Sequence, residues 1–288
     1  MLVEKSSVYS AHILVPLPRI SVEKGSPSVP QSSEIEVGRD GPITIIKLNR
    51  PQVRNAINKS TAEALRAAWM AFAADEQARV GILTGGDDVF CAGADLRDIQ
   101  GLAGEIEGEY GPLGFTRLSV SKPTIAAVAG YCVAGGLEIA CWCDLRIADE
   151  TAIFGCFERR FGVPLVDGGT QRLPRIVGLG RALELILTGR PLPAREALTM
   201  GLANEVVPPG ESLQRALELG HMLARFPQGC LRNDRQAVYE GLGKELTEGL
   251  RIEAVFGAKT IQSGEPTAGS QAFQSGKGRK GEFESRNL

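Results

Sequence analysis

Stretches rich in apolar residues alternate with short polar turns along most of the chain. The runs "EIEV" (34–37) and "ITIIKLN" (43–49) flank the turn "GRDGP", which predicts a β-hairpin. The run "STAEALRAAWMAFAADEQ" (60–77) predicts a helix that begins with a capping box between Ser60 and Glu63.

The next segments predict an α/β core. Two continuous apolar runs, "VGILTG" (80–85) and "TIAAVAG" (124–130), predict buried strands, and residues 137–141 predict a buried helix after the second run. Two short strands are predicted at 145–150 and 152–158. Strands and helices alternate over this part of the chain, which is the pattern of an α/β fold.

The pattern becomes mainly helical after Gly168. Three short helices, each ended by a glycine, are predicted at 168–178, 181–189 and 194–201. The run "NEVVP" (204–208) predicts a last strand, and long helices are predicted from Glu211 onward.

The two ends of the chain differ from this body. Residues 1–33 are rich in Pro and Ser without a stable period, and we expect an irregular extension without a targeting role. Residues 264–288 are rich in Gly, Ser and Lys, and we expect a flexible tail there.

Composition and charge exclude several classes of protein. The 288 residues are 43% hydrophobic and 23% charged, as in ordinary globular proteins. No apolar run reaches the ~18 residues that a membrane-spanning helix needs. A net charge of −2 gives no general attraction to nucleic acid or anionic lipid, so we expect neither as a partner.

Cysteine and histidine usage narrows the chemistry. The six cysteines show no CxxC pairing and mostly lie in apolar runs, which indicates a reducing compartment. Cys141 and Cys143 form a CxC, but no second ligand pair accompanies them, so we expect no metal site. The only histidines are His12, in the irregular extension, and His221, in an amphipathic helix, so carboxylates are the expected acid–base groups.

Two turns place small residues where extended chain gives way to helix, in "VFCAGADL" (89–96) and "YCVAGGLEIA" (131–140). Small residues let a ligand approach backbone amides closely, and the starts of helices leave those amides unpaired. Two such turns facing each other could hold one oxyanion between two amides. Alternatively, the glycines serve tight turns and packing alone.

Two glutamates lie near these turns. Glu138 falls in the first turn of the predicted helix, where it can serve proton transfer or simply cap free amides. Glu158 follows a predicted strand, where it can serve the same chemistry or form a surface ion pair with Arg159 or Arg160. The spacing of the two glutamates in the sequence does not show that they meet.

Four segments resemble the crotonase family, also called the enoyl-CoA hydratase/isomerase superfamily. They are "LNRPQVRNAIN", "FCAGADL", "AAVAGYCVAGGLEIACWCDLRIA" and "FGVPLVDGGTQRLPRIVG", in the family's order and approximate spacing. The similarity covers about residues 34–260. It implies an α/β spiral of ββα units over 34–200 and a helical region over 201–263 that assembles homotrimers, often paired into hexamers.

The resemblance also implies an acyl-CoA thioester as ligand, with no cofactor besides the coenzyme A that belongs to the substrate. In the family, backbone amides that match Ala94 and Gly135 form the oxyanion hole for the thioester oxygen. Glutamates that match Glu138 and Glu158 hold the water that adds across the double bond. By analogy, Glu138 would orient and activate this water and Glu158 would exchange the proton at the α-carbon.

Further contacts with the substrate follow from the same resemblance. Coenzyme A lies, in the family, along segments that match "VRNAIN" and "CAGADL". The expected contacts are Arg54, Ala56, Ala92, Gly93, Asp95, Leu96 and Gly136. Arg54 could equally be a solvated surface arginine, and Asp95 could simply cap the following turn.

Two departures from the family pattern concern charged residues. "PLVDGGT" places Asp167 where many hydratases have a glycine-rich stretch. Asp167 would therefore be a third acid at the substrate or would form a salt bridge with Arg172. Arg159 or Arg160 beside Glu158 would lower the pKa of that carboxyl, against a role as proton donor.

The expected activity is that of an enoyl-CoA hydratase, a lyase that adds water to a 2-enoyl-CoA. An enoyl-CoA or dienoyl-CoA isomerase of the same family is the alternative, and a non-catalytic acyl-CoA- or RNA-binding relative is a third reading. A cytoplasmic location is expected, or the mitochondrial matrix if the source is eukaryotic.

Overall fold

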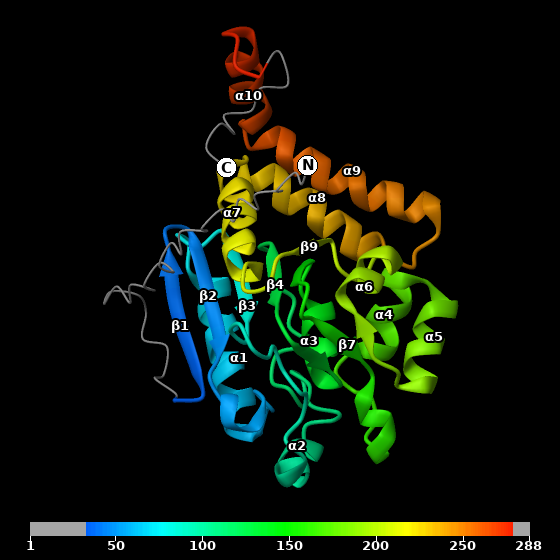
Figure 1. Cartoon of the computed structure of the whole chain (residues 1–288). Coiled ribbons are helices and arrows are strands. Elements are labelled where there is room, and N and C mark those ends of the chain that lie inside the picture. Colours follow the sequence, from blue (N-terminus) through cyan, green and yellow to red (C-terminus); the bar gives the residue numbers. More distant parts are fainter. Residues whose placement is uncertain (1–32, 279–288) are drawn as a thin grey trace, which may run out of the picture.

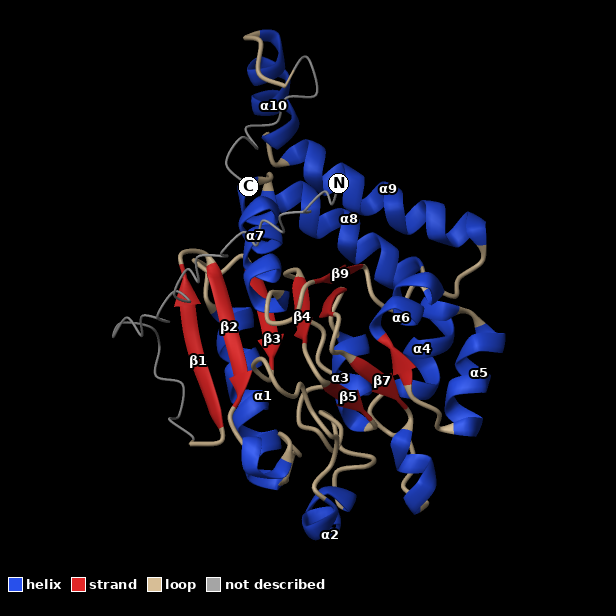
Figure 2. Cartoon of the chain, viewed as in Figure 1, coloured by secondary structure: helices blue, strands red, loops and turns tan. Residues whose placement is uncertain are grey.

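A six-stranded sheet in the order β1-β2-β3-β4-β6-β9 runs through the molecule (Figures 1 and 2). Its strands are β1 (Ile35–Asp40), β2 (Ile43–Leu48), β3 (Val80–Thr84), β4 (Thr124–Val128), β6 (Leu145–Asp149) and β9 (Glu205–Val207). β1 and β2 form the predicted antiparallel hairpin, and the later pairings in this sheet are parallel. The computed structural model describes residues 33–278, so the predicted extension lies, except for Ser33, outside the described residues.

A second sheet of three short strands stands beside the first, in the order β5-β7-β8. Its strands are β5 (Tyr131–Val133), β7 (Ile153–Gly155) and β8 (Leu192–Pro193). The strand predicted at 152–158 therefore ends early, and a short 3-10 helix, η3 (Phe157–Phe161), follows it. Glu158 therefore lies in η3 and not in a strand, and its side chain is buried.

Both faces of the large sheet are covered. Alternate residues of each strand point to opposite sides, so a strand such as β3 contributes to two hydrophobic clusters. On one side, Val80 and Ile82 pack with helix α7 (Ser212–Arg225). On the other side, Leu83 belongs to the larger core that includes helix α1 (Lys59–Ala74). β3 is buried along its whole length, as its continuous apolar run predicts.

The remaining helices are short in the middle of the chain and longer near its end. They are α2 (Ile99–Ala103), α3 (Gly135–Trp142), α4 (Gly169–Val177), α5 (Leu179–Thr188), α6 (Ala194–Met200), α8 (Gln228–Gly241), α9 (Leu246–Gln262) and α10 (Glu265–Gln274). The helices α3 to α9 all lie where helices were predicted. α10 occupies a segment for which the sequence predicted a tail without a helix, and Glu265 at its start accepts hydrogen bonds from the N–H groups of Gly229 and Cys230 in α8.

The capping box predicted for α1 is wrong. α1 begins at Lys59, and its N-cap is Asn58, whose Oδ1 accepts hydrogen bonds from the N–H of Thr61 at 2.8 Å and from its hydroxyl at 2.6 Å. Ser60 is exposed in the first turn. Asn is as good a cap as Ser, and Asn58 has the extended backbone that a cap requires. The observed cap therefore lies two residues before the predicted one.

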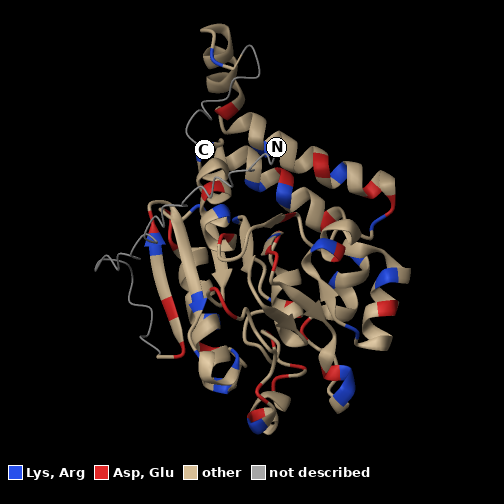
Figure 3. Ribbon diagram, in the orientation of Figure 1, with Lys and Arg blue, Asp and Glu red and all other residues tan. Residues whose placement is uncertain are grey.

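Charged residues of both signs are spread over the elements. Figure 3 shows Lys and Arg interspersed with Asp and Glu along the ribbon. Between residues 33 and 278, no helix combines the length and the apolar character needed to cross a membrane. The same residues contain no group of three or more His, Cys, Asp or Glu side chains that could hold a metal ion.

The cap assignment gives a direct prediction for stability. We expect Asn58→Ala to lower the free energy of unfolding by about 1 kcal/mol, because two donors at the start of α1 lose their acceptor. Ser60→Ala in the same turn is the matched control and should change stability by less than about 0.5 kcal/mol. Urea unfolding measures both, and a loss in Ser60→Ala as large as in Asn58→Ala would contradict the assignment.

Candidate active site

Two chain reversals meet backbone to backbone between the sheets. Cys91 and Cys132 form an isolated parallel bridge, which fixes the two segments side by side. A Cβ on Gly93 would lie 2.7 Å from the amide nitrogen of Gly135, and a Cβ on Gly136 would lie 2.1 Å from the carbonyl oxygen of Cys91. Only glycine fits either position. These glycines therefore serve the packing of the two turns against each other, and the binding of an oxyanion between them stays a prediction.

The amides of Ala94 and Gly135 lie at this crossing. The nitrogen of Ala94 is 3.5 Å from the place where a Cβ on Gly135 would be. Within residues 33–278 neither N–H has a hydrogen-bond partner. Ala134, just before α3, has φ 54° and ψ −128°, a backbone conformation that is costly for a residue other than glycine and is typical of functional sites.

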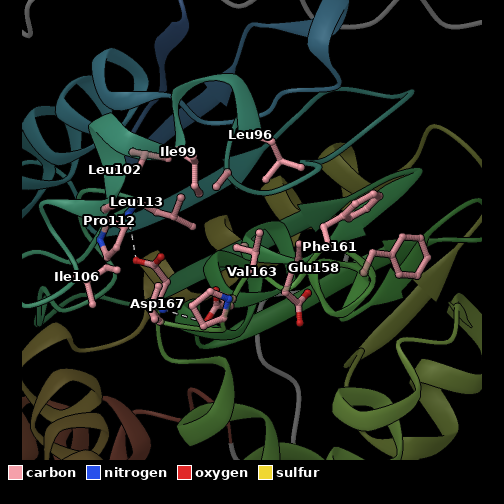
Figure 4. A pocket seen from close by; sticks show the side chains of 18 of the residues that line it. Leu96, Ile99, Leu102, Ile106, Pro112, Leu113, Glu158, Phe161, Val163 and Asp167 are labelled. Carbon is pink, nitrogen blue, oxygen red and sulfur yellow. Dashed lines mark hydrogen bonds between the residues drawn. The ribbon is translucent and has the colours of Figure 1, made fainter.

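Both amides border a cavity of about 270 Å³. Figure 4 shows Leu96, Ile99 and Leu102 on one side of it and Val163 and Phe161 across from them. The first group comes from the segment around α2, and the second comes from η3 and the chain that follows it. The charged groups in the lining are three carboxyls, Glu138, Glu158 and Asp167.

Glu138 is buried in the first turn of α3 and does not cap that helix. Its Oε1 accepts hydrogen bonds from the N–H groups of Asp167 at 2.9 Å and Gly169 at 2.7 Å. Burial, followed by the charge of Asp167, raises the pKa of Glu138 to about 8 from its ordinary 4.5. Its second oxygen, Oε2, makes no hydrogen bond within residues 33–278.

Glu158 is also buried, and neither of its carboxyl oxygens has a hydrogen-bond partner in the described part of the chain. Arg159 instead donates to the carbonyl of Ile186, and Arg160 donates to the carbonyl of Gly189. The charge of Arg159 does lower the pKa of Glu158, as predicted, but burial raises that pKa more, so the net shift is upward. An unpaired buried carboxyl is costly to the stability of the fold.

Comparison with known proteins identifies the family of this chain. Residues 38–286 match the sequence profile of the family described as enoyl-CoA hydratase/isomerase. The chain is 39% identical over 253 residues to a probable enoyl-CoA hydratase of Rhizobium meliloti, which covers 87% of this chain and 97% of the relative. It is 38% identical over 217 residues to the crotonyl-CoA hydratase of Syntrophomonas wolfei, which covers 74% and 84%. The chain belongs to the enoyl-CoA hydratase/isomerase family.

Solved structures support the same assignment for the fold. The crystal structure of the enoyl-CoA hydratase from Bacillus anthracis superimposes on this family member with a TM-score of 0.79 at 33% identity, over 84% of this chain and 96% of that one. The structure of Pseudomonas aeruginosa DspI gives a TM-score of 0.80 at 28% identity, over 87% and 97%. The predicted α/β crotonase fold with C-terminal helices is therefore confirmed.

Asp167 lines the cavity of this family member, as expected for a third acid. The alternative, a salt bridge with Arg172, does not form. Arg172 donates to the backbone carbonyls of Asp167 and Thr116, while the Oδ1 of Asp167 accepts from the Thr116 hydroxyl at 2.6 Å and the Leu113 N–H at 3.1 Å. Burial raises the pKa of Asp167 above its ordinary value.

The other predicted contacts divide into two groups. Ala92 and Leu96 border the cavity, and Leu96 is half exposed at 49%. Arg54 is exposed outside it, with its guanidinium 5.8 Å from the centre of the Tyr131 ring. Asp95 accepts a hydrogen bond from the N–H of Arg97 and so caps the next turn, the structural alternative stated above.

Ala56, Gly93 and Gly136 are not among the residues that border the cavity. Ala56 is buried, and its carbonyl accepts a hydrogen bond from Arg50. Gly93 and Gly136 act through the close contact of the two turns. The sequence did not identify Leu113 or Thr116, whose contacts with Asp167 span more than fifty residues and leave no local signal.

The buried state of Glu138 predicts how stability depends on pH. Because the folded-state pKa is raised, the protonated carboxyl stabilises the fold, fully below about pH 4.5 and no longer above about pH 8. We expect the free energy of unfolding of the wild type to fall between these limits relative to Glu138→Gln. The expected fall is about 1.4 kcal/mol for each unit of pKa shift. Urea unfolding across this range tests the expectation, and parallel curves for the two proteins would contradict it.

Proposed function

We propose that the protein is an enoyl-CoA hydratase that adds water across the double bond of a 2-enoyl-CoA thioester. The observation that carries the proposal is the meeting of two unpaired amides and two buried carboxyls at one apolar cavity. A binding protein would not need buried carboxyls without partners, whose desolvation costs stability. The third reading from the sequence, a non-catalytic relative, is disfavoured for this reason.

The two amides would bind the thioester oxygen. The N–H groups of Ala94 and Gly135 would both donate to it, and negative charge would develop there when the nucleophile adds to the β-carbon. A preorganised donor in a dry site is worth roughly 3–4 kcal/mol to the transition state. The apolar walls of the cavity, which include Ile99 on one side and Val163 on the other, would hold the acyl chain and exclude bulk water.

The two glutamates would hold the water that reacts. Glu138, in its ionised form, would take a proton from this water while the oxygen of the water bonds to the β-carbon, and Glu158, in its protonated form, would deliver its proton to the α-carbon. The product therefore gains one water, and the two carboxyls exchange roles in the reverse direction. A pKa close to the working pH suits a group that must both take and return a proton, and Glu138 has such a pKa.

Arg54, outside the cavity, and Leu96, at its border, remain proposed contacts for coenzyme A. Arg54 is exposed and supplies a positive charge for a phosphate group, and Leu96 offers an exposed apolar surface at the cavity. Coenzyme A enters with the substrate, so the proposed reaction uses no separate cofactor.

An isomerase that moves a double bond in an enoyl-CoA or dienoyl-CoA is the second candidate. The observation that favours it is the third carboxyl, Asp167, on the same cavity. Isomerisation uses the same oxyanion hole but leaves the mass of the substrate unchanged. The mass of the product therefore separates the two activities.

We further propose that the chain forms a homotrimer, either free or as a dimer of trimers. No residue of α8 is buried, and large apolar side chains of α8, α9 and the loop between them are exposed. They are Val238, Leu242, Leu246, Leu250, Val255 and Ile261. Figure 1 shows these two helices side by side at one edge of the molecule, where another copy of the chain could cover them.

The compartment also remains a proposal. All six cysteines are free and five of them are buried, which supports the predicted cytoplasmic location. The mitochondrial matrix is the alternative, because relatives from Arabidopsis thaliana and Dictyostelium discoideum are named mitochondrial.

Activity is tested with crotonyl-CoA, by loss of the enoyl-thioester absorbance and the mass of the product. We expect the gain of one water in the wild type. Glu138→Gln and Glu158→Gln should each lower kcat/KM by about 10²–10⁴-fold, because each loses one proton transfer. Glu63→Gln, the same change on the exposed face of α1, should keep wild-type activity. Full activity in Glu158→Gln would remove that residue from the mechanism, and acyl-CoA binding without water addition would favour the isomerase.

Assembly is tested by light scattering coupled to size-exclusion chromatography. We expect three or six times the mass of 30.7 kDa for one chain. Leu246→Lys and Leu250→Lys together should shift the protein toward smaller species, because they place charge on the exposed apolar face of α9. A monomeric wild type would contradict the proposed trimer.

A further inference from the structure

Asp167 is the carboxyl group of the cavity to which the proposed hydration gives no role. It is 4% exposed and lies in the turn just before α4. Its own N–H and that of Gly169 hold the Oε1 of Glu138. A Cβ on Gly169 would lie 2.9 Å from this oxygen, so glycine is needed there for the amide to come so close. Asp167 and Glu138 are therefore built as one unit.

The carboxylate of Asp167 is itself held in place. Its Oδ1 accepts the Thr116 hydroxyl and the Leu113 N–H. Gly111 has φ 77°, and a Cβ there would lie 2.9 Å from Oδ1 and 2.5 Å from the Thr116 hydroxyl oxygen. The loop before Leu113 is thus shaped around this carboxylate. Two donors favour the ionised form of Asp167, and the two N–H groups on Oε1 do the same for Glu138, so the donors alone do not decide which carboxyl is charged.

No cation is paired with either carboxyl within the described residues. Arg172 donates to the carbonyls of Thr116 and Asp167, and Arg117 donates to the carbonyls of Ile106 and Gly108. Two buried carboxyls without a neutralising partner do not readily ionise together, because each negative charge disfavours the other.

The remaining titratable and charged groups around the pair come from α3, the segment after β7, the loop before β4, and α4. They are Cys141, Cys156, Glu158, Arg117 and Arg172. The thiols are buried and their pKa values are raised to about 11 for Cys141 and about 12 for Cys156, so both stay neutral. Both arginines favour the ionised form of Asp167, and Arg172 also interacts with the charge of Glu138.

A second cavity gives Asp167 and Glu138 different surroundings. It measures about 230 Å³ and is bordered by Thr116, Thr170, Arg172 and Asp167, whereas Glu138 and Glu158 do not border it. Asp167 therefore meets polar surroundings on the side away from the thioester site. Of these two cavities, Glu138 borders only the apolar one, whereas Asp167 borders both.

We propose that Asp167 is a positioning residue that fixes the protonation of Glu138. The pair holds one proton, Asp167 carries the negative charge, and the proton stays on Glu138 until a ligand or a rise in pH removes it. The raised pKa of Glu138 agrees with this arrangement. The effect of Asp167 on turnover rests on the proposed hydratase function. That the pair of carboxyls holds a single proton is, by contrast, a property of the free protein.

The test is an infrared titration of the full chain without ligand. The C=O stretching band of a protonated carboxyl is assigned to Glu138 by its loss in Glu138→Gln. We expect the band to be present in the wild type at neutral pH and to disappear near pH 8. In Asp167→Asn, which keeps the shape and the N–H but removes the charge, the midpoint should fall by about one pH unit or more. Glu107→Gln, an exposed neutralisation in the loop after α2, is the control and should leave the midpoint unchanged.

An unchanged midpoint in Asp167→Asn would overturn the proposal. Asp167→Ser removes the same charge with a smaller side chain and gives the comparison if the Asn variant does not fold. The pH profile of kcat/KM on crotonyl-CoA supplies a second readout, and its lower limb should move by the same amount and in the same direction. A protein that shows the infrared shift but adds no water to crotonyl-CoA would refute the hydratase function and leave the shared proton standing.

Discussion

The close contact of two backbone turns is the constraint on which the site depends. Gly93 and Gly136 permit this contact because any side chain there would collide with backbone of the opposite turn. The contact places the amides of Ala94 and Gly135 beside one cavity, and the strained backbone of Ala134 is held by the packing around it. Both sheets contribute, since one turn follows β3 and the other follows β5. The site is therefore a product of the whole core and not of one local motif.

The carboxyl groups are retained at a cost to stability. Glu158 is buried with two oxygens that have no partner, and Glu138 and Asp167 are buried without a paired cation. Well-packed apolar residues in the same places would give a more stable protein. Raised pKa values are what proton transfer near neutral pH requires, so the same burial that destabilises the fold supports the proposed chemistry.

Much of the fold could be predicted from the sequence, because apolar periodicity and glycine positions act locally. The hairpin, the buried strands and most helices were found in this way, while the cap of α1 was assigned to Ser60 because two nearby residues, Asn58 and Ser60, are both good caps. The partners of Glu138 were not predictable, since Asp167 and Gly169 come from a turn about thirty residues away. The direction in which Arg159 shifts the pKa of Glu158 was predicted correctly, but the sequence could not show that burial of Glu158 outweighs it.

In the proposed mechanism, the amides of Ala94 and Gly135 bind one thioester oxygen between the two glutamates. A crystal structure with an unreactive saturated ligand, butyryl-CoA, tests it most directly. We predict that the thioester oxygen lies about 3 Å from both amide nitrogens, with the β-carbon facing Glu138 and Glu158. A butyryl group seated elsewhere, with the two amides bonded to water or to protein, would contradict the account.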